Sequence, residues 1–176
     1  MNKAVFLDRD GVINKPIIID GKCYAPRLLK DFKILPKVKS DIKKLKNKGF
    51  KVFVITNQPD IGNKLLKKKT LNEMHSLLKA KVPIDKIYFC PHTRNDRCKC
   101  RKPKPGMIIK ASNDSKIRLK ESYVVGDRKT DIDAGLKVGC KTIFVNNNYY
   151  EKKPTKQEKT VKSLHNAVKY ILKQKN

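Results

Sequence analysis

The sequence VFLDRDG occupies residues 5–11, and the interpretation of the whole chain starts from it. Its first three residues are apolar and include the β-branched and aromatic side chains that are typical of a buried strand. Asp8 and Asp10 follow directly, and Gly11 ends the stretch. Because Asp and Gly are favoured in turns, the stretch taken alone fits either a strand-ending turn or a reactive site. Other segments of the chain are needed to distinguish a turn from a reactive site.

Short apolar segments of the same kind recur along the chain and alternate with helical patterns. Strands are predicted at residues 4–7, 52–55, 87–89, 123–125 and 142–145. Helices are predicted within residues 36–49, 70–82, 105–112, 130–137 and 161–174. The second of them is expected to begin with a capping box formed by Thr70 and Glu73. Residues 146–159 are predicted to be a polar loop. This alternation predicts an α/β fold, a three-layer Rossmann-like parallel sheet with helices on both faces.

The chain of 176 residues has the length of one compact domain, so residues 1–176 are interpreted as a single domain. Few residues remain for a cap domain, and residues 14–27 are expected to form a flap over the site. No apolar run approaches the roughly 18 residues of a membrane span, and the start has no signal-peptide pattern. We therefore expect a cytoplasmic protein that does not contact a membrane, and we expect a monomer.

The chain carries 43 basic and 16 acidic residues, a net charge of +27, which raises the question of a nucleic-acid partner. Most of the basic residues are lysines spread over predicted helix faces and loops, whereas arginine is the usual reader of bases. A solvated basic surface is therefore favoured over nucleic-acid binding. Such a field would also attract a small phosphorylated substrate.

Three polar segments follow predicted strands, and ligands of parallel sheets bind beyond the carboxyl ends of the strands. They begin at Asp8, Thr56 and Gly126. A carboxylate attacks a phosphate poorly unless a divalent cation offsets the repulsion, and magnesium prefers oxygen ligands. Asp8 and Asp127 can supply carboxylates, and Asp10 can offer its main-chain carbonyl while its side chain acts as acid and base. Thr56 and a lysine can contact the phosphoryl oxygens.

These residues stand in segments that resemble the four motifs of the haloacid dehalogenase superfamily phosphatases: VFLDRDGVIN (5–14), VITNQ (54–58), CRKPKPGM (100–107) and VGDR (125–128). The set is similar to the branch that contains the heptose 1,7-bisphosphate phosphatases and histidinol-phosphatase, over about residues 3–145. The resemblance implies nucleophile Asp8, acid/base Asp10, phosphoryl contacts from Thr56 and Lys102, substrate contacts from Asn57, Arg101 and Arg128, and magnesium at Asp8, Asp10 and Asp127.

Three cysteines and one histidine gather in a short segment: Cys90, His92, Cys98 and Cys100. Three thiolates and an imidazole are a ligand set that zinc takes in closed tetrahedral sites. A structural zinc ion is therefore predicted, and the resemblance implies the same site in the loop before Lys102. The ion would hold this loop in place.

The remaining cysteines, histidines and Asp131 are given structural interpretations. Cys23 and Cys140 are interpreted as ordinary packing residues, and His75 and His165 as surface or packing residues away from the motifs. Asp131 suits the first turn of a helix, although it can also orient a metal-bound water.

The leading hypothesis is a magnesium-dependent phosphatase that acts on a small metabolite through an aspartyl phosphate, best represented by heptose 1,7-bisphosphate. Histidinol phosphate is the alternative substrate within the same class. A nucleic-acid 3′-end phosphatase and a non-catalytic polyanion-binding module remain as alternatives from other classes. Three clustered carboxylates argue against the binding module, since they are costly without a cation.

Overall fold

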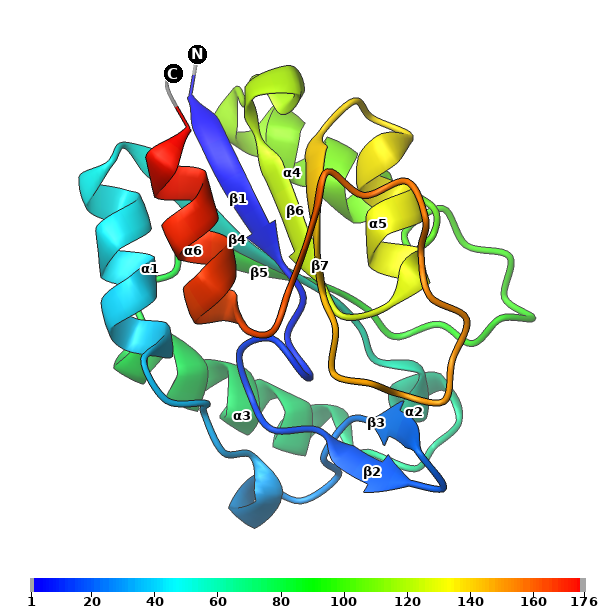
Figure 1. Ribbon diagram of the computed structural model, residues 1–176. Helices are drawn as coiled ribbons and strands as arrows, with labels where there is room; N and C mark the ends of the chain where they lie inside the picture. The colour runs from blue at the N-terminus through cyan, green and yellow to red at the C-terminus, as the bar shows by residue number, and fades with distance from the viewer. Residues whose placement is uncertain (1, 175–176) are drawn as a thin grey trace.

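The computed structural model describes residues 2–174, which form a six-stranded parallel sheet with helices on both faces (Figure 1). The strand order is β5-β4-β1-β6-β7-β8, so β1 lies inside the sheet between β4 and β6. The strands of this sheet are β1 (Lys3–Leu7), β4 (Phe50–Asn57), β5 (Lys86–Cys90), β6 (Tyr123–Gly126), β7 (Lys141–Val145) and β8 (Lys159–Val161). The α-helices are α1 (Val38–Asn47), α2 (Pro59–Gly62), α3 (Lys68–Lys81), α4 (Gly106–Ser115), α5 (Lys129–Leu136) and α6 (Leu164–Lys173).

The two faces of β1 are buried in two different hydrophobic clusters. Val5 and Leu7 pack on one face with side chains of α1, α3 and α6. Ala4 and Phe6 point to the opposite face and pack with side chains of α4 and α5. Since side chains alternate along a strand, a strand that is apolar at every position must be covered on both sides. The predicted three-layer α/β fold is therefore confirmed.

The start of α3 differs from the predicted capping box. The helix begins at Lys68, and the residue before it, Lys67, makes no side-chain cap hydrogen bond. Thr70 therefore lies inside the first turn, where its side chain cannot cap the helix. The buried side chain of Leu66 packs just before the helix. At the start of this helix the structure therefore shows an apolar packing contact and no polar side-chain cap.

The C-terminal region contains a strand that the sequence pattern does not reveal. Residues 159–161 form β8, which pairs with β7 at the edge of the sheet. The predicted helix over 161–174 therefore begins later, at Leu164, and Ser163 caps it by accepting a hydrogen bond from the Asn166 main-chain nitrogen at 3.3 Å. A strand of three residues that includes lysine and threonine is too short and too polar to show the alternation of apolar and polar residues by which strands are predicted.

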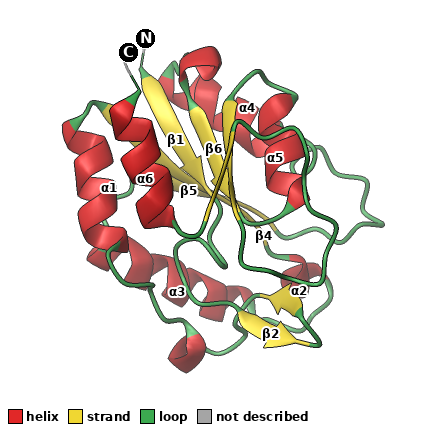
Figure 2. Cartoon of the chain, in the orientation of Figure 1, coloured by secondary structure: helices red, strands yellow, loops and turns green. Residues whose placement is uncertain are grey.

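The predicted flap is a small antiparallel hairpin, β2 (Ile17–Ile19) and β3 (Lys22–Tyr24), which stands apart from the main sheet (Figure 2). Two 3₁₀ turns complete the elements, η1 (Leu29–Asp31) and η2 (Leu119–Glu121). The main-chain nitrogen of Tyr150 donates to the Gly21 carbonyl at 2.8 Å, which ties the loop after β7 to the hairpin. The hairpin and this loop thus lie together beyond the carboxyl ends of the strands (Figure 1). Among residues 2–174, no helix combines the length and apolar character needed to cross a membrane.

Close packing of α5 on the sheet gives a test of the fold. A Cβ atom added at Gly135 would lie 2.8 Å from Thr142 Cγ2 and 2.9 Å from Val124 Cβ. We expect Gly135→Val to lower the free energy of unfolding by about 1–3 kcal/mol, since the buried strands cannot move away freely. Urea denaturation measures the change. Leu136→Val, on the exposed side of the same helix, should stay within about 0.5 kcal/mol of wild type, and equal losses in both variants would contradict this packing.

Candidate active site

Asp8 follows the last residue of β1 and lines a cavity of about 990 Å³. Its main-chain nitrogen donates to the Val125 carbonyl at 2.9 Å, which continues the pairing of β1 with β6. Because β1 is flanked by β4 and β6, the segments after these two strands adjoin Asp8. The topology thereby brings Thr56 and Asp131 to the same cavity, as the sequence analysis expects for Thr56.

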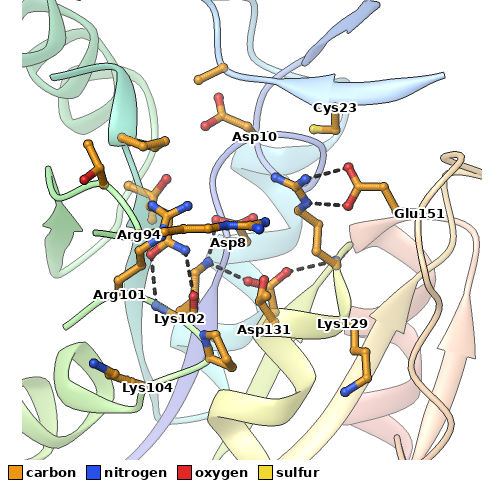
Figure 3. A pocket seen from close by; sticks show the side chains of 18 of the residues that line it. Asp8, Asp10, Cys23, Arg94, Arg101, Lys102, Lys104, Lys129, Asp131 and Glu151 are labelled. Carbon is orange, nitrogen blue, oxygen red and sulfur yellow. Dashed lines mark hydrogen bonds and ion pairs between the residues drawn. The ribbon is translucent and has the colours of Figure 1, made fainter. Parts of the chain in front are cut away.

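Lys102 is the cation that contacts this carboxylate. Its Nζ lies 2.9 Å from Asp8 Oδ1 and 2.6 Å from Asp131 Oδ1 (Figure 3). It also donates to the Ile55 carbonyl at 2.8 Å. The side chain is almost completely buried. Burial opposes the charge, but the Asp131 and Asp8 carboxylates outweigh it and raise the pKa of Lys102 above its ordinary value. Lys102 therefore stays charged beside the candidate nucleophile.

Three buried carboxylates gather at this point. Oxygens of Asp8, Asp127 and Asp131 all lie within 4.8 Å of one another. Burial is the largest cause that raises the pKa of Asp8, to about 6, and the neighbouring carboxylates act in the same direction. The charge of Lys102 opposes this shift. Burial and the Asp8 and Asp131 carboxylates raise the pKa of Asp127. Asp127 Oδ1 is buried without a hydrogen-bond partner among residues 2–174.

An oxygen-rich cluster with excess negative charge and an unpaired oxygen fits a divalent cation such as magnesium. Asp8 and Asp127 are two of the predicted ligands. Asp131 is the third carboxylate, although the sequence analysis favoured a purely structural role for it. It has that role as well, because Asp131 Oδ2 accepts from the Arg128 main-chain nitrogen at 2.9 Å in the capping box of α5.

Two glycines make room for these carboxylates. A Cβ atom at Gly126 would lie 2.1 Å from Asp131 Cβ, and one at Gly11 would lie 1.8 Å from Asp127 Oδ2. Gly11 also has a φ of +87°, a conformation that strains other residues. Both glycines follow predicted strands, where the sequence shows them only as turn residues.

Asp10 lines the cavity but is separate from this carboxylate cluster. Its carboxylate accepts hydrogen bonds from Arg9, from Asn14 Nδ2 at 2.9 Å and from Gln58 Nε2 at 2.8 Å. Gln58 also donates to Thr56 Oγ1 at 2.9 Å, so the acid/base candidate and the phosphoryl-contact candidate share a donor. The predicted side chains Asp8, Asp10, Thr56 and Lys102 are thus brought together around one cavity.

The predicted substrate-contact residues also border the cavity. Asn57 joins two loops, since its Oδ1 accepts from the Lys102 main-chain nitrogen and its Nδ2 donates to the Lys102 carbonyl, both at 3.1 Å. Arg101 Nη1 donates to the His92 carbonyl at 3.1 Å. Arg128 is paired with Glu151 through two hydrogen bonds, of 2.8 and 2.5 Å, so its charge is largely balanced within the chain (Figure 3).

The cysteine and histidine side chains form a second cluster at the edge of this cavity. Ligand atoms of Cys90, His92, Cys98 and Cys100 lie within 4.8 Å of one another. His92 Nδ1 is 3.5 Å from Cys90 Sγ and 3.3 Å from Cys100 Sγ, and Cys98 Sγ is 3.6 Å from each of the other two sulfurs. These separations suit four soft ligands around one metal ion. Lys102 is only two residues beyond Cys100, so the cluster and the active-site lysine are mechanically linked.

The loop after β7 supplies contacts that the sequence analysis missed. Asn147 Nδ2 donates to the Gly11 carbonyl at 3.0 Å, to Tyr149 Oη at 2.9 Å and to Asp127 Oδ2 at 3.2 Å. The loop had been interpreted only as a polar connection. Its position after a parallel strand is the signal that could have indicated a role in the site.

Two residues interpreted as remote or ordinary lie close to the motifs. His75 is buried and its Nε2 is 3.2 Å from Arg9 Nη1, so its interpretation as a residue away from the motifs is wrong. Cys23, on the flap, lines the cavity. His165 lies 3.0 Å from the Asp41 carboxylate, outside the cavity, as expected for a packing residue.

Comparison with known proteins gives matches over most of the chain. A family model described as HAD-hydrolase-like matches residues 99–170. A D-glycero-beta-D-manno-heptose-1,7-bisphosphate 7-phosphatase from Helicobacter pylori is 36% identical over 80% of this chain and 81% of its own. The D-glycero-alpha-D-manno-heptose-1,7-bisphosphate 7-phosphatase of Campylobacter jejuni is 35% identical, covering 95% and 96%.

Among solved structures, a D,D-heptose 1,7-bisphosphate phosphatase from B. bronchiseptica, complexed with magnesium and phosphate, is similar with a TM-score of 0.82. It shares 27% sequence identity, and the match covers 97% of this chain and 98% of that one. The similarity therefore extends over almost the whole length of both chains.

The raised pKa of Asp8 predicts how pH affects the metal-free protein. A pKa that rises from 3.8 to about 6 on folding favours the folded state at low pH, and this contribution is lost as pH rises from about 4 to 6. Asp8→Asn should remove the part of this dependence that comes from Asp8, while the part from Asp127 remains, and make the metal-free protein more stable at pH 7 by about 1–3 kcal/mol. Urea denaturation in magnesium-free buffer without chelator, at pH 4 to 7, measures the effect.

The matched control for this measurement is Asp20→Asn, which changes an exposed carboxylate in the turn of the flap. It should follow the pH dependence of wild type. If Asp8→Asn also followed it, repulsion within the carboxylate cluster would not limit stability. Added magnesium should reduce the advantage of Asp8→Asn, because the cation stabilises the wild-type cluster.

Proposed function

The chain belongs to the haloacid dehalogenase-like hydrolases, in the family that includes the D-glycero-D-manno-heptose-1,7-bisphosphate 7-phosphatases, and we propose that it hydrolyses the 7-phosphate of this heptose bisphosphate. Members of this family are phosphoric monoester hydrolases, and so is this protein. The observation that carries the proposal is the buried Asp8, held beside Lys102 and two further carboxylates at the floor of a cavity with basic walls.

In the proposed first step, Asp8 attacks the phosphorus atom while the bond from phosphorus to the sugar oxygen breaks. Asp10 gives its proton to the departing oxygen, which leaves as an alcohol and leaves the phosphoryl group on Asp8. In the second step, Asp10 removes a proton from water, and the water oxygen attacks the phosphorus. Phosphate departs, the carboxylate of Asp8 is restored and Asp10 is protonated again.

The surrounding residues would stabilise the charge that develops on the phosphoryl group. Thr56 and Lys102 would contact its oxygens, and the fixed ammonium requires no rearrangement during the reaction. Magnesium, held by Asp8 and Asp127 with the main-chain carbonyl of Asp10, would offset the repulsion between carboxylate and phosphate. Asp131, the third carboxylate of the cluster, would orient Lys102 through their 2.6 Å ion pair.

The rest of the sugar would contact Asn57, Arg101 and Arg128. The small hairpin leaves the cavity open to solvent, which suits a sugar with a second phosphate. Because every group in this mechanism comes from one chain, we propose that the protein acts as a monomer. We place it in the cytoplasm, where the clustered cysteines stay reduced.

We further propose that Cys90, His92, Cys98 and Cys100 bind a structural zinc ion. Four protein ligands leave no open position for a substrate, so the ion would act on the conformation of the loop. Its effect would be to hold Arg101 and Lys102 in place, since both follow Cys100 directly.

Phosphate release is the direct test of the activity. Wild type should release phosphate from the heptose bisphosphate only when magnesium is present. Asp8→Asn should lower the rate at least about 10³-fold, since it removes the nucleophile. Asp114→Asn, which changes an exposed carboxylate on α4, is the control and should retain full activity. Turnover by Asp8→Asn at the wild-type rate would refute the mechanism.

The same assay identifies the substrate when fructose 1,6-bisphosphate, histidinol phosphate and a 3′-phosphorylated oligonucleotide are included. A nucleic-acid end phosphatase is the second candidate function, because seven further basic residues line the cavity: Lys22, Arg94, Arg97, Lys104, Lys129, Lys137 and Lys152. Preference for the oligonucleotide would favour that function over the heptose assignment.

Metal content tests the structural zinc site. Purified wild type should contain about one zinc ion per chain, and Cys98→Ser should lose it and unfold at a lower temperature. Cys140→Ala removes a buried cysteine that is not one of the four clustered ligands and should keep its zinc. Equal zinc content in wild type and Cys98→Ser would show that the cluster does not bind the ion.

A further inference from the structure

We propose that Arg9 and His75 are a buried pair of positioning residues that fix the carboxylate of Asp10 for proton transfer. The proposal rests on the proposed phosphatase function and deepens it. It assigns a part in the reaction to two side chains that do not line the cavity, one of them on a helix that lies outside the four motifs in the sequence.

Arg9 holds Asp10 through a forked contact. Arg9 Nη2 donates to Asp10 Oδ1 at 3.0 Å and to Oδ2 at 3.1 Å, and Arg9 Nε lies 3.3 Å from Oδ1. Arg9 has no exposed surface, whereas Asp10 lines the cavity. The guanidinium thus lies behind the carboxylate, on the side away from the cavity. Contacts from a planar fork to both oxygens restrict the rotation of the carboxylate.

His75 holds the other end of the guanidinium. Its Nε2 is 3.2 Å from Arg9 Nη1, and since arginine can only donate, Nε2 must be the acceptor. Burial and the charge of Arg9 lower the pKa of His75 to about 3, which keeps the ring neutral and able to accept. The ring is itself fixed, edge-on to Phe89 with 5.5 Å between centroids. Arg9 also stacks over Phe32 at 5.3 Å.

A buried arginine is costly unless a carboxylate compensates its charge. The carboxylate that Arg9 pairs with is the one facing the cavity, and Asn14 and Gln58 donate to the same carboxylate. His75 comes from α3, so a helix outside the motifs determines where the guanidinium lies. The chain of contacts runs from α3 through His75 and Arg9 to Asp10.

The pair should matter most when the leaving group needs a proton. A sugar alkoxide is a poor leaving group and depends on the acid, whereas p-nitrophenolate leaves readily without one. Without an acceptor at position 75, Arg9 Nη1 has a buried N–H group without its partner, and the fork is free to tilt. A misplaced Asp10 would then slow transfer from a sugar phosphate far more than transfer from p-nitrophenyl phosphate.

The experiment compares His75→Phe, His75→Gln and wild type in single-turnover formation of the phosphoenzyme. The phenylalanine fills the ring's space but cannot accept, and the glutamine can accept through its side-chain oxygen. We expect His75→Phe to lower the maximal rate with a sugar phosphate at least about tenfold, with the half-saturating concentration nearly unchanged, and with p-nitrophenyl phosphate by less than about threefold. His75→Gln should recover most of the loss.

His165→Phe is the matched control, since this histidine contacts Asp41 outside the cavity, and its rates should equal those of wild type. Circular dichroism and thermal unfolding verify that each variant is folded, and His75→Leu replaces His75→Phe if the latter is not. Equal losses with both substrates, no loss with either, or no recovery in His75→Gln would each overturn the proposal. Absence of sugar phosphate turnover by wild type would instead refute the proposed function itself.

Discussion

The ion pairs of Lys102 with Asp8 and Asp131 are the interaction on which the site depends. Burying several carboxylates at one point is unfavourable, because each loses hydration and repels the others. The ammonium offsets part of that cost, and it would also contact the phosphoryl oxygens while Asp8 attacks the phosphorus. Without it, the same carboxylates would favour protonation, and Asp8 would lose the charge that makes it a nucleophile.

The parts of the fold around Lys102 keep it in that position. The Asn57 side chain binds both the main-chain N–H and the main-chain carbonyl of Lys102, and the Ile55 carbonyl accepts from the Lys102 ammonium. Residues of β4 therefore fix both the main chain and the end of the side chain of Lys102. The cysteine and histidine cluster fixes the loop that precedes it. Gly126 allows Asp131 to approach closely. Residues from three separate parts of the chain thus position Lys102.

Asp8 and Asp10 are two residues apart but lie in different environments, which separates their chemical roles. Asp8 lies in the carboxylate cluster beside Lys102, where a metal ion and a phosphate can meet it. Asp10 is surrounded by the donors Arg9, Asn14 and Gln58, which hold its side chain away from that cluster. Two identical groups can then serve as nucleophile and as acid because the neighbouring side chains differ.

The sequence by itself determined the layered α/β fold, because apolar segments of strand length alternate with amphipathic helices. It also indicated which strand ends carry Asp8, Thr56 and Asp127, and which four residues could bind a metal, because local order and spacing encode these features. Only the tertiary structure brought Asp131 and His75 to the motifs and added β8 to the sheet. Their roles depend on contacts between segments far apart in the chain, and such contacts leave no local period or spacing in the sequence.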